Sequence, residues 1–136
     1  MTNLEIITSA LRMLSVLDAN ETASDEDAQV GLEQMNDFMS LLLADSIDLG
    51  YTAQTDVLDV FPLDDVIAAQ LKPLLAVHLH AFYPASTVPD SLPMRAQLAK
   101  DQLTRASVLA NMEEASMSNI PLGEAYAPDF DITTRT

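Results

Sequence analysis

The residues that most often carry chemistry are few in this chain, and their spacing keeps them apart. His78 and His80 are the only histidines, and both stand in a long apolar run. Side chains two positions apart on a helix point to roughly opposite sides, so this pair does not share a metal ion as an i, i+4 pair can. The absence of cysteine excludes disulfides and thiolate metal sites. We interpret both histidines as packed or half-exposed side chains.

The charged clusters do not have the spacing of a functional site. Asp25, Glu26 and Asp27 are consecutive, so their side chains diverge, and they lack the spacing of a calcium-binding loop. The bases between residues 95 and 105 recur every five positions, which turns each one about 140° from the last around a helix. The chain has only three glycines and no glycine-rich phosphate-binding loop. No serine has a histidine and an acid that the sequence identifies as partners in a catalytic triad. The sequence therefore predicts that the protein is not an enzyme and that it has no cofactor-binding site and no metal site.

Charge is the most unusual property of the composition. The 136 residues carry a formal net charge of −15 and suit a single domain. Residues 1–71 hold 14 acids and one base, Arg12, whereas residues 72–136 hold seven acids and five bases. Nucleic-acid binders need clustered cations, which this chain lacks. The acidity either keeps the protein soluble or forms a surface that repels a polyanion such as DNA.

Apolar stripes at helical spacing predict an all-α fold, a small bundle of about four helices. Thr2 and Glu5 match a capping box at the start of a helix over residues 2–17. A second helix is expected to begin at Ser24 or Asp25 and to end near residues 46–49, with Gly50 as its stop. Its inner stripe is expected to consist of Ala28, Leu32, Met35, Met39, Leu42 and Leu43.

The third and fourth helices differ in how much of their surface is apolar. Asp64 is expected to cap a third helix over residues 66–83, which is apolar on nearly all sides and should be the most buried. Pro73 should kink or restart this helix, and its polar residues exclude a membrane span. A fourth helix is expected from residues 92–93 to about Glu114. Its stripe of small residues consists of Leu92, Ala96, Ala99, Leu103, Ala106 and Ala110.

Two segments lie outside these helices. Residues 51–62 predict an extended connecting arm or short strand that projects toward a neighbour, with an ordinary surface loop as the alternative. Residues 116–136 lack periodicity but hold large apolar side chains, which favours an extended C-terminal arm that orders against a partner over a frayed terminus. We therefore expect a helical domain over residues 1–115 and an arm over residues 116–136. The arm residues expected to contact the partner are Ile120, Pro121, Leu122, Tyr126, Phe130 and Ile132.

Several apolar residues exceed what one core needs. The helix over residues 2–17 has two adjacent apolar stripes, so it is either central in the fold or in contact with two partners. Val30 and Leu41 fall on the outer side of the second helix, and the segment 51–62 alternates loosely between apolar and polar residues. The predicted subunit interface consists of Ile6, Met13, Val30, Leu41, Val57, Leu58 and Val60.

The order of residues over the first 84 positions is more specific than any single motif. It runs from ALRMLSVL at residues 10–17, through Ala28, Gly31-Leu32 and MNDFM at residues 35–39, to IDLGY at residues 47–51. This order resembles the head-to-tail adaptor family of tailed phages, the packaged-DNA stabilisation or tail accessory factors of short-tailed phages. Residues 75–84 resemble the family's next helix and its tyrosine-ended loop. Ser15 stands where a glycine is common in the family.

The resemblance implies a virion protein of the phage neck, assembled in the host cytoplasm. Such adaptors form a homo-oligomeric ring, usually a dodecamer, between the portal protein and the tail or nozzle protein. They complete the head, extend the DNA channel, retain packaged DNA until ejection and give the tail a docking surface. On this hypothesis Asp25, Glu26 and Asp27 face the channel, double-stranded DNA passes without specific binding, the C-terminal arm contacts the portal, and no membrane is involved.

Two other hypotheses fit the sequence. The chain could instead resemble the related helical head–tail connector of long-tailed phages, which has the same task in a different kind of tail. Alternatively, it is an acidic helical binding or regulatory module, such as a DNA mimic, which would bind a basic nucleic-acid-binding protein.

Overall fold

The computed structural model describes residues 1–118, and its regular structure is helical. It contains α1 (Asn3–Met13), α2 (Asp25–Ala44), α3 (Asp65–Leu79), the short 3-10 helix η1 (His80–Phe82) and α4 (Leu92–Ser118). The described residues form no strand, only an isolated bridge between Thr2 and Val60. The prediction of an all-α bundle of about four helices is confirmed. No helix in residues 1–118 has the length and apolar character needed to cross a membrane.

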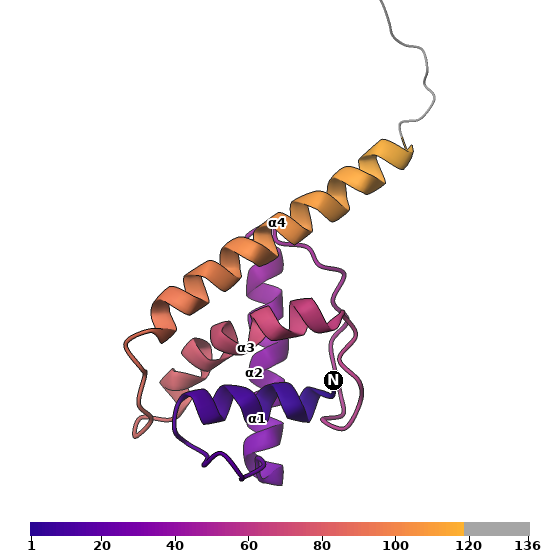
Figure 1. Ribbon diagram of the computed structural model, residues 1–136. Coiled ribbons are helices and arrows are strands. Elements are labelled where there is room, and N and C mark those ends of the chain that lie inside the picture. Colours follow the sequence, from indigo (N-terminus) through magenta and orange to yellow (C-terminus); the bar gives the residue numbers. More distant parts are fainter. Residues whose placement is uncertain (119–136) are drawn as a thin grey trace, which may run out of the picture.

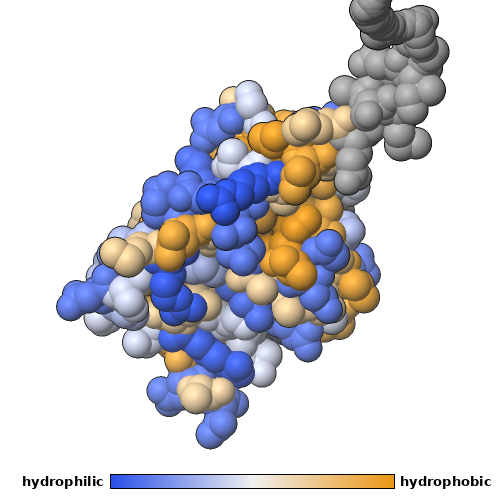
Figure 2. Space-filling view, turned by 45° about the horizontal axis from the view of Figure 1, so that its top comes forward, coloured by the Kyte–Doolittle hydropathy of each residue, from blue (hydrophilic) through white to orange (hydrophobic). Residues whose placement is uncertain are grey.

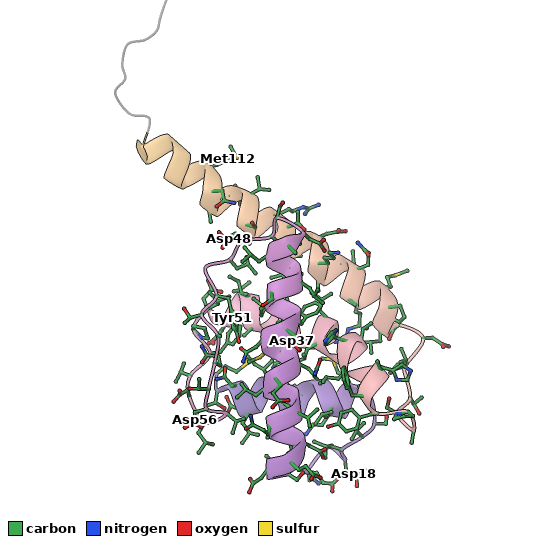
Figure 3. All side chains as sticks on the ribbon, turned by 180° about the vertical axis from the view of Figure 1, so that it is seen from behind. Asp18, Asp37, Asp48, Tyr51, Asp56 and Met112 are labelled. Carbon is green, nitrogen blue, oxygen red and sulfur yellow. The ribbon has the colours of Figure 1, made fainter. Side chains whose placement is uncertain are left out.

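The helices form one layer that is crossed by a single helix. Figure 1 shows α1, α3 and α4 side by side, and α2 running across them; Figure 3, seen from behind, shows α2 in front of the other three. The helix α3 packs against α1, α2 and α4, which makes it the central element. Ala68, Leu71, Leu75 and Leu79 of α3 are all completely buried. The apolar helix that was expected to be the most buried therefore occupies the centre of the bundle, although α1 buries a larger share of its residues.

The helix starts follow the sequence signals. Thr2 Oγ1 accepts the N–H of Glu5 at 3.2 Å, and Glu5 Oε1 accepts the N–H of Thr2 at 2.8 Å, so the capping box is present. Ser24 caps α2 by accepting the N–H of Asp27. Asp64 caps α3 by accepting an amide N–H at 3.0 Å. Each cap satisfies a backbone donor that the helix itself leaves unpaired.

The helix ends differ from the prediction because two serines adopt the left-handed conformation. The helix α1 ends at Met13, not at residue 17, because Ser15 has a φ of 59°. The helix α2 ends at Ala44, because Ser46 has a φ of 67°. In both places the next N–H bonds to a carbonyl five residues earlier, as in a Schellman motif. Gly50 also has a positive φ, but it lies in the following loop and does not end the helix.

The third and fourth helices also depart from expectation in detail. The helix α3 continues through the buried Pro73, and residues 80–82 form a separate 3-10 turn. The helix α4 runs to Ser118, past the predicted domain boundary at residue 115. Its stripe is buried from Leu92 to Leu103, but Ala110 is exposed because this part of α4 extends beyond the other helices (Figure 1).

The connecting segment of residues 51–62 lies against the start of α1 and does not project. The N–H of Asn3 donates to the carbonyl of Asp59 at 3.0 Å, and the N–H of Leu4 donates to that of Val57 at 2.7 Å. Phe61 is buried in the core. The segment therefore satisfies the free amide groups of the first turn of α1, and the surface-loop alternative describes its position.

Candidate interaction surfaces

The predicted subunit interface divides into buried and exposed residues. Ile6 has no exposed surface and lies within the core of its own chain, so we withdraw it from the interface. Met13, Val30 and Val57 are half-buried. Leu41, Leu58 and Val60 expose 55%, 67% and 69% of their surface, so they are the members of the set that a neighbour can reach. Leu43, which was expected in the inner stripe of α2, is also exposed.

An apolar groove lies between α2, α3 and α4. It has a volume of about 390 Å³. Leu41 and Val77 contribute exposed side chains to it, and the ion pair between Lys100 Nζ and Asp45 Oδ2 at 3.5 Å lies at its edge. Its apolar and aromatic lining consists of Phe38, Leu41, Leu42, Ala44, Leu74, Val77 and His78.

A second apolar surface lies on the part of α4 that extends beyond the body. Ser107 is the last buried residue of α4 whose burial is defined, and its Oγ accepts the N–H of Asp48 at 3.0 Å. Beyond it, Val108, Leu109 and Met112 are all more than half exposed. Figure 2, which turns the top of the molecule forward, shows hydrophobic surface gathered at its upper right. We call these three residues the α4 ridge.

The three consecutive acids at the start of α2 are not equivalent. Asp25 and Glu26 are exposed, whereas Asp27 is half-buried and accepts a hydrogen bond from the Tyr83 hydroxyl at 2.9 Å. Burial, with the neighbouring Asp27 as a further cause, raises the pKa of Tyr83 to about 12. Asp27 therefore connects α2 to the loop after η1, and of the three acids only Asp25 and Glu26 are exposed.

The two histidines have separate surroundings. His78 Nε2 lies 3.1 Å from Gln34 Oε1, and its ring lies 5.4 Å from the ring of Phe38. Burial lowers the pKa of His78, and the charge of Asp37 opposes this shift. His80 Nδ1 instead lies 2.6 Å from a serine hydroxyl in its own loop. Within residues 1–118, no three histidine or acidic side chains gather in a way that suits a metal ion.

Sequence reasoning missed a polar cluster behind α2. Asn36 Oδ1 accepts hydrogen bonds from the Tyr51 hydroxyl and, at 2.9 Å, from the N–H of Gln54. The side-chain oxygen of Gln54 in turn accepts from Asn3 Nδ2 at 3.0 Å. Burial raises the pKa of Tyr51 to about 12, although its contact with Gln54 acts in the opposite direction. The cluster attaches the loop 51–56 to α2, and Figure 3 shows Tyr51 beside α2.

The predicted portal-contact residues lie outside the described part of the chain. Ile120, Pro121, Leu122, Tyr126, Phe130 and Ile132 all follow residue 118, where the description ends.

In comparisons with known proteins, the chain matches no family model, no curated protein and no solved structure. Its function is therefore argued from its sequence and its surfaces.

Proposed function

We propose that this protein is a structural adaptor of a tailed phage, which forms a homo-oligomeric ring between the portal and the tail. One observation carries the proposal: large apolar side chains remain exposed at several places on a small acidic domain. Leu41, Leu58 and Val60 belong to the surface expected from the sequence, and the α4 ridge adds a further face. Extended apolar surface of this kind is typical of proteins that assemble.

A ring needs two different surfaces on each copy. In a ring, each subunit contacts its two neighbours through non-identical patches, whereas a two-fold dimer uses the same patch twice. The exposed residues of α2 and of the loop 57–60 provide apolar surface for lateral contacts between copies. The exposed charge must be placed elsewhere, since like charges across an interface weaken association.

The acidic surface suits a channel through which DNA slides. Residues 1–71 hold 14 acids and one base, and in the described part of the chain only two ion pairs form. Most carboxylates of the described residues therefore have no cation beside them that would neutralise their negative charge. A lumen lined by Asp25 and Glu26 offers DNA phosphates no row of cations, so DNA passes without releasing counterions and without being held.

The direct test is assembly on a portal. Purified protein is mixed with its portal ring, and the product is imaged by electron microscopy. We expect a ring of density on one end of the portal, along the channel axis. A portal that stays bare at saturating protein overturns the proposal, and tight binding to a basic nucleic-acid-binding protein instead supports the acidic regulatory module.

Two variants test the lateral contacts separately from folding. Leu41→Glu and Leu58→Glu place a charge on the predicted interface, and we expect each to weaken ring formation about tenfold or more. Met94→Glu is the matched control, because Met94 is also a largely exposed apolar residue but lies outside the predicted set. Equal effects of all three variants would show that added charge alone, and not this surface, controls assembly.

The C-terminal segment is tested by truncation after Ser118. Because α4 includes Ser118, this cut leaves the helical domain intact, and circular dichroism should show unchanged helical signal and unfolding. We expect the truncated protein to lose portal binding. Retained binding would remove the portal-contact role predicted for the C-terminal arm.

A further inference from the structure

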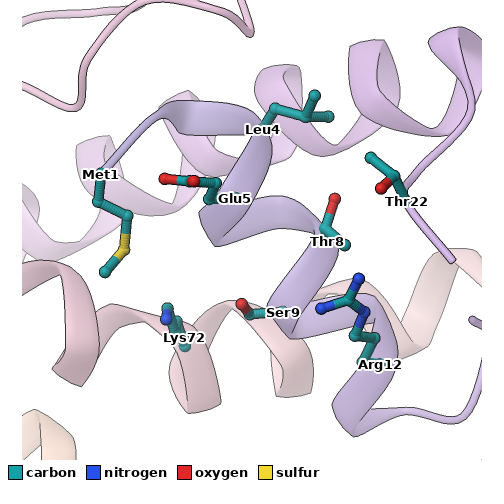
Figure 4. Close-up of a pocket in the computed structure, with 8 residues that line it drawn as sticks. All are labelled: Met1, Leu4, Glu5, Thr8, Ser9, Arg12, Thr22 and Lys72. Carbon is teal, nitrogen blue, oxygen red and sulfur yellow. The ribbon is translucent and has the colours of Figure 1, made fainter. Parts of the chain in front are cut away.

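A hollow on the outer face of α1 gathers most of the positive charge of the N-terminal half (Figure 4). It has a volume of about 510 Å³. Arg12 of α1 and Lys72 of α3 both line it, and they are the only bases in the first 72 residues. Its complete lining consists of Met1, Leu4, Glu5, Thr8, Ser9, Arg12, Thr22 and Lys72.

Within the described part of the chain, neither base is paired with an acid, although the protein is strongly acidic. The two ion pairs of the described residues involve other groups. Arg12 donates from Nε and Nη2 to the carbonyl of Glu21, at 3.0 and 2.6 Å. These bonds fix the guanidinium and leave Nη1 without a hydrogen-bond partner within residues 1–112. The ammonium of Lys72 also lacks such a partner there, and its side chain is half-buried.

The hydroxyl groups of the hollow differ from two other helical hydroxyls of this protein, those of Ser40 and Thr104. Ser40 donates to the carbonyl of Asn36, and Thr104 donates to that of Lys100, each four residues earlier. This is the usual way for a helical serine or threonine to satisfy its proton. Thr8 and Ser9 make no such bond within the described chain.

Thr8 is the more informative of the two hydroxyls. It is 4% exposed, and its Oγ1 accepts the N–H of Ala23 at 3.3 Å. Its own proton has no acceptor within residues 1–112, and its side chain lines the hollow. A buried donor without an acceptor costs free energy, and a ligand that offers only acceptors removes this cost.

The one acid in the wall is engaged elsewhere. Glu5 Oε1 accepts the N–H of Thr2 as part of the capping box. Figure 4 shows its carboxylate toward the Met1 end of the hollow, while Arg12 lies at the opposite end and the Ser9 hydroxyl is turned toward Lys72. Arg12 and Lys72 therefore supply two positive charges to the wall, against the single carboxylate of Glu5.

We propose that this hollow binds a phosphate-class oxyanion, either free or carried by a small phosphomonoester. The free N–H and O–H groups of Arg12, Lys72, Thr8 and Ser9 are hydrogen-bond donors that need acceptors. Phosphate oxygens are strong acceptors and so match these donors. The volume lies within the range of small-molecule sites and exceeds that of one oxyanion, and Leu4 gives apolar surface to an organic substituent. The site does not depend on ring assembly, so failure to bind phosphate would not contradict the adaptor proposal, and failure to assemble would not contradict the site.

The test is a titration of the full chain, followed by ¹H–¹⁵N NMR. Inorganic phosphate and phenyl phosphate are the probes, with chloride at equal ionic strength as the reference. We expect saturable shifts at the amides of Thr8, Ser9, Arg12 and their neighbours, with a dissociation constant in the millimolar range or tighter. Shifts that do not saturate, or that map to another face, overturn the proposal.

Lysine variants make the test specific. Lys72→Gln removes one charge-assisted contact and is expected to weaken binding about tenfold or more. Lys100→Gln is the matched control, because it makes the same charge change beside the apolar groove. We expect it to have no effect, and Lys72→Arg to restore binding. Equal weakening by both glutamine variants, or no rescue by arginine in a folded protein, would refute the site.

A third arm separates the small anion from nucleic acid. Short duplex DNA is titrated under the same conditions, and we expect no binding, because the net charge of −15 repels a long polyanion. DNA binding that Lys72→Gln abolishes would overturn the assignment of a small ligand.

Discussion

Gly31→Ala tests whether the crossing of α1 and α2 depends on the absence of a single methyl group. A Cβ at position 31 would lie 2.4 Å from Cγ2 of Ile7 and 3.3 Å from its Cβ. Carbon atoms rest about 3.5–4.0 Å apart, so the overlap exceeds about 1 Å. Ile7 is completely buried and β-branched, so it cannot turn away without a steric clash. The helices must therefore move apart.

The expected net cost follows from two opposing contributions. Overpacking a buried contact costs about 1–3 kcal/mol, and this overlap lies at the upper end of that range. Alanine is the better helix former by about 1 kcal/mol, which offsets part of the cost. We expect Gly31→Ala to lower the free energy of unfolding by about 2 kcal/mol. Urea unfolding followed by circular dichroism at helical wavelengths measures it.

A double-mutant cycle shows whether Ile7 is the cause. Ile7→Ala alone should cost about 2–5 kcal/mol, because it opens a cavity. If Ile7 is the clashing group, adding Gly31→Ala to Ile7→Ala should cost almost nothing further. Gly50→Ala is the control, because a Cβ there meets nothing within 4 Å and its positive φ is the only penalty. A neutral Gly31→Ala, or strict additivity with Ile7→Ala, would refute the reasoning.

Three further predictions concern helix ends, protonation and a buried contact. Ser15→Gly and Ser46→Gly should each stabilise the protein by about 1 kcal/mol in urea unfolding, because glycine adopts the positive φ of these positions without strain. The lowered pKa of His78 means that the unfolded chain binds its proton more readily, so His78 contributes stability above about pH 6.5 that is lost as the pH falls through its folded pKa. The difference in unfolding free energy between wild type and His78→Gln should therefore shrink from pH 7 to pH 5, and a constant difference would contradict this. Tyr83→Phe should lower stability by about 1–2 kcal/mol, because it removes the hydrogen bond to Asp27.

Helix starts were predictable because their signals are local. Ser24 and Asp64 each bond to an amide three residues ahead, so the residue type and its position carry the whole effect. Helix ends were less predictable, because serine, the residue at positions 15 and 46, does not itself favour a left-handed backbone. Tertiary packing of the following residues, including Ile47 in the core, holds them there.

The sequence predicted which sides of the helices are buried, but not which element or chain covers them. The two apolar stripes of α1 correctly indicated a helix covered on two sides. They are covered by α2 and α3 of the same chain, so Ile6 belongs to the core and not to an interface. Periodicity reports which side of a helix needs cover, but it does not report what covers it.

The hollow on α1 was not predictable because its cations come from distant parts of the chain. Arg12 and Lys72 are 60 positions apart, and only the packing of α1 on α3 brings both to one cavity. The charge count singled out Arg12 as the lone base of the first 71 residues. A lone cation in an acidic segment was a signal, but its meaning depended on the fold.

The residues that carry the resemblance to phage adaptors have structural roles in this fold. Gly31 permits the close approach of α1, Met35 is fully buried, and Asn36 binds the loop that begins at Tyr51. All of these positions specify how the first two helices and their exit loop pack. A shared order of such residues is thus an argument for a shared fold, and function does not follow from fold alone. The adaptor proposal therefore depends on Leu41, Leu58, Val60 and the α4 ridge, which the core does not require, and these surfaces are where substitutions should separate assembly from folding.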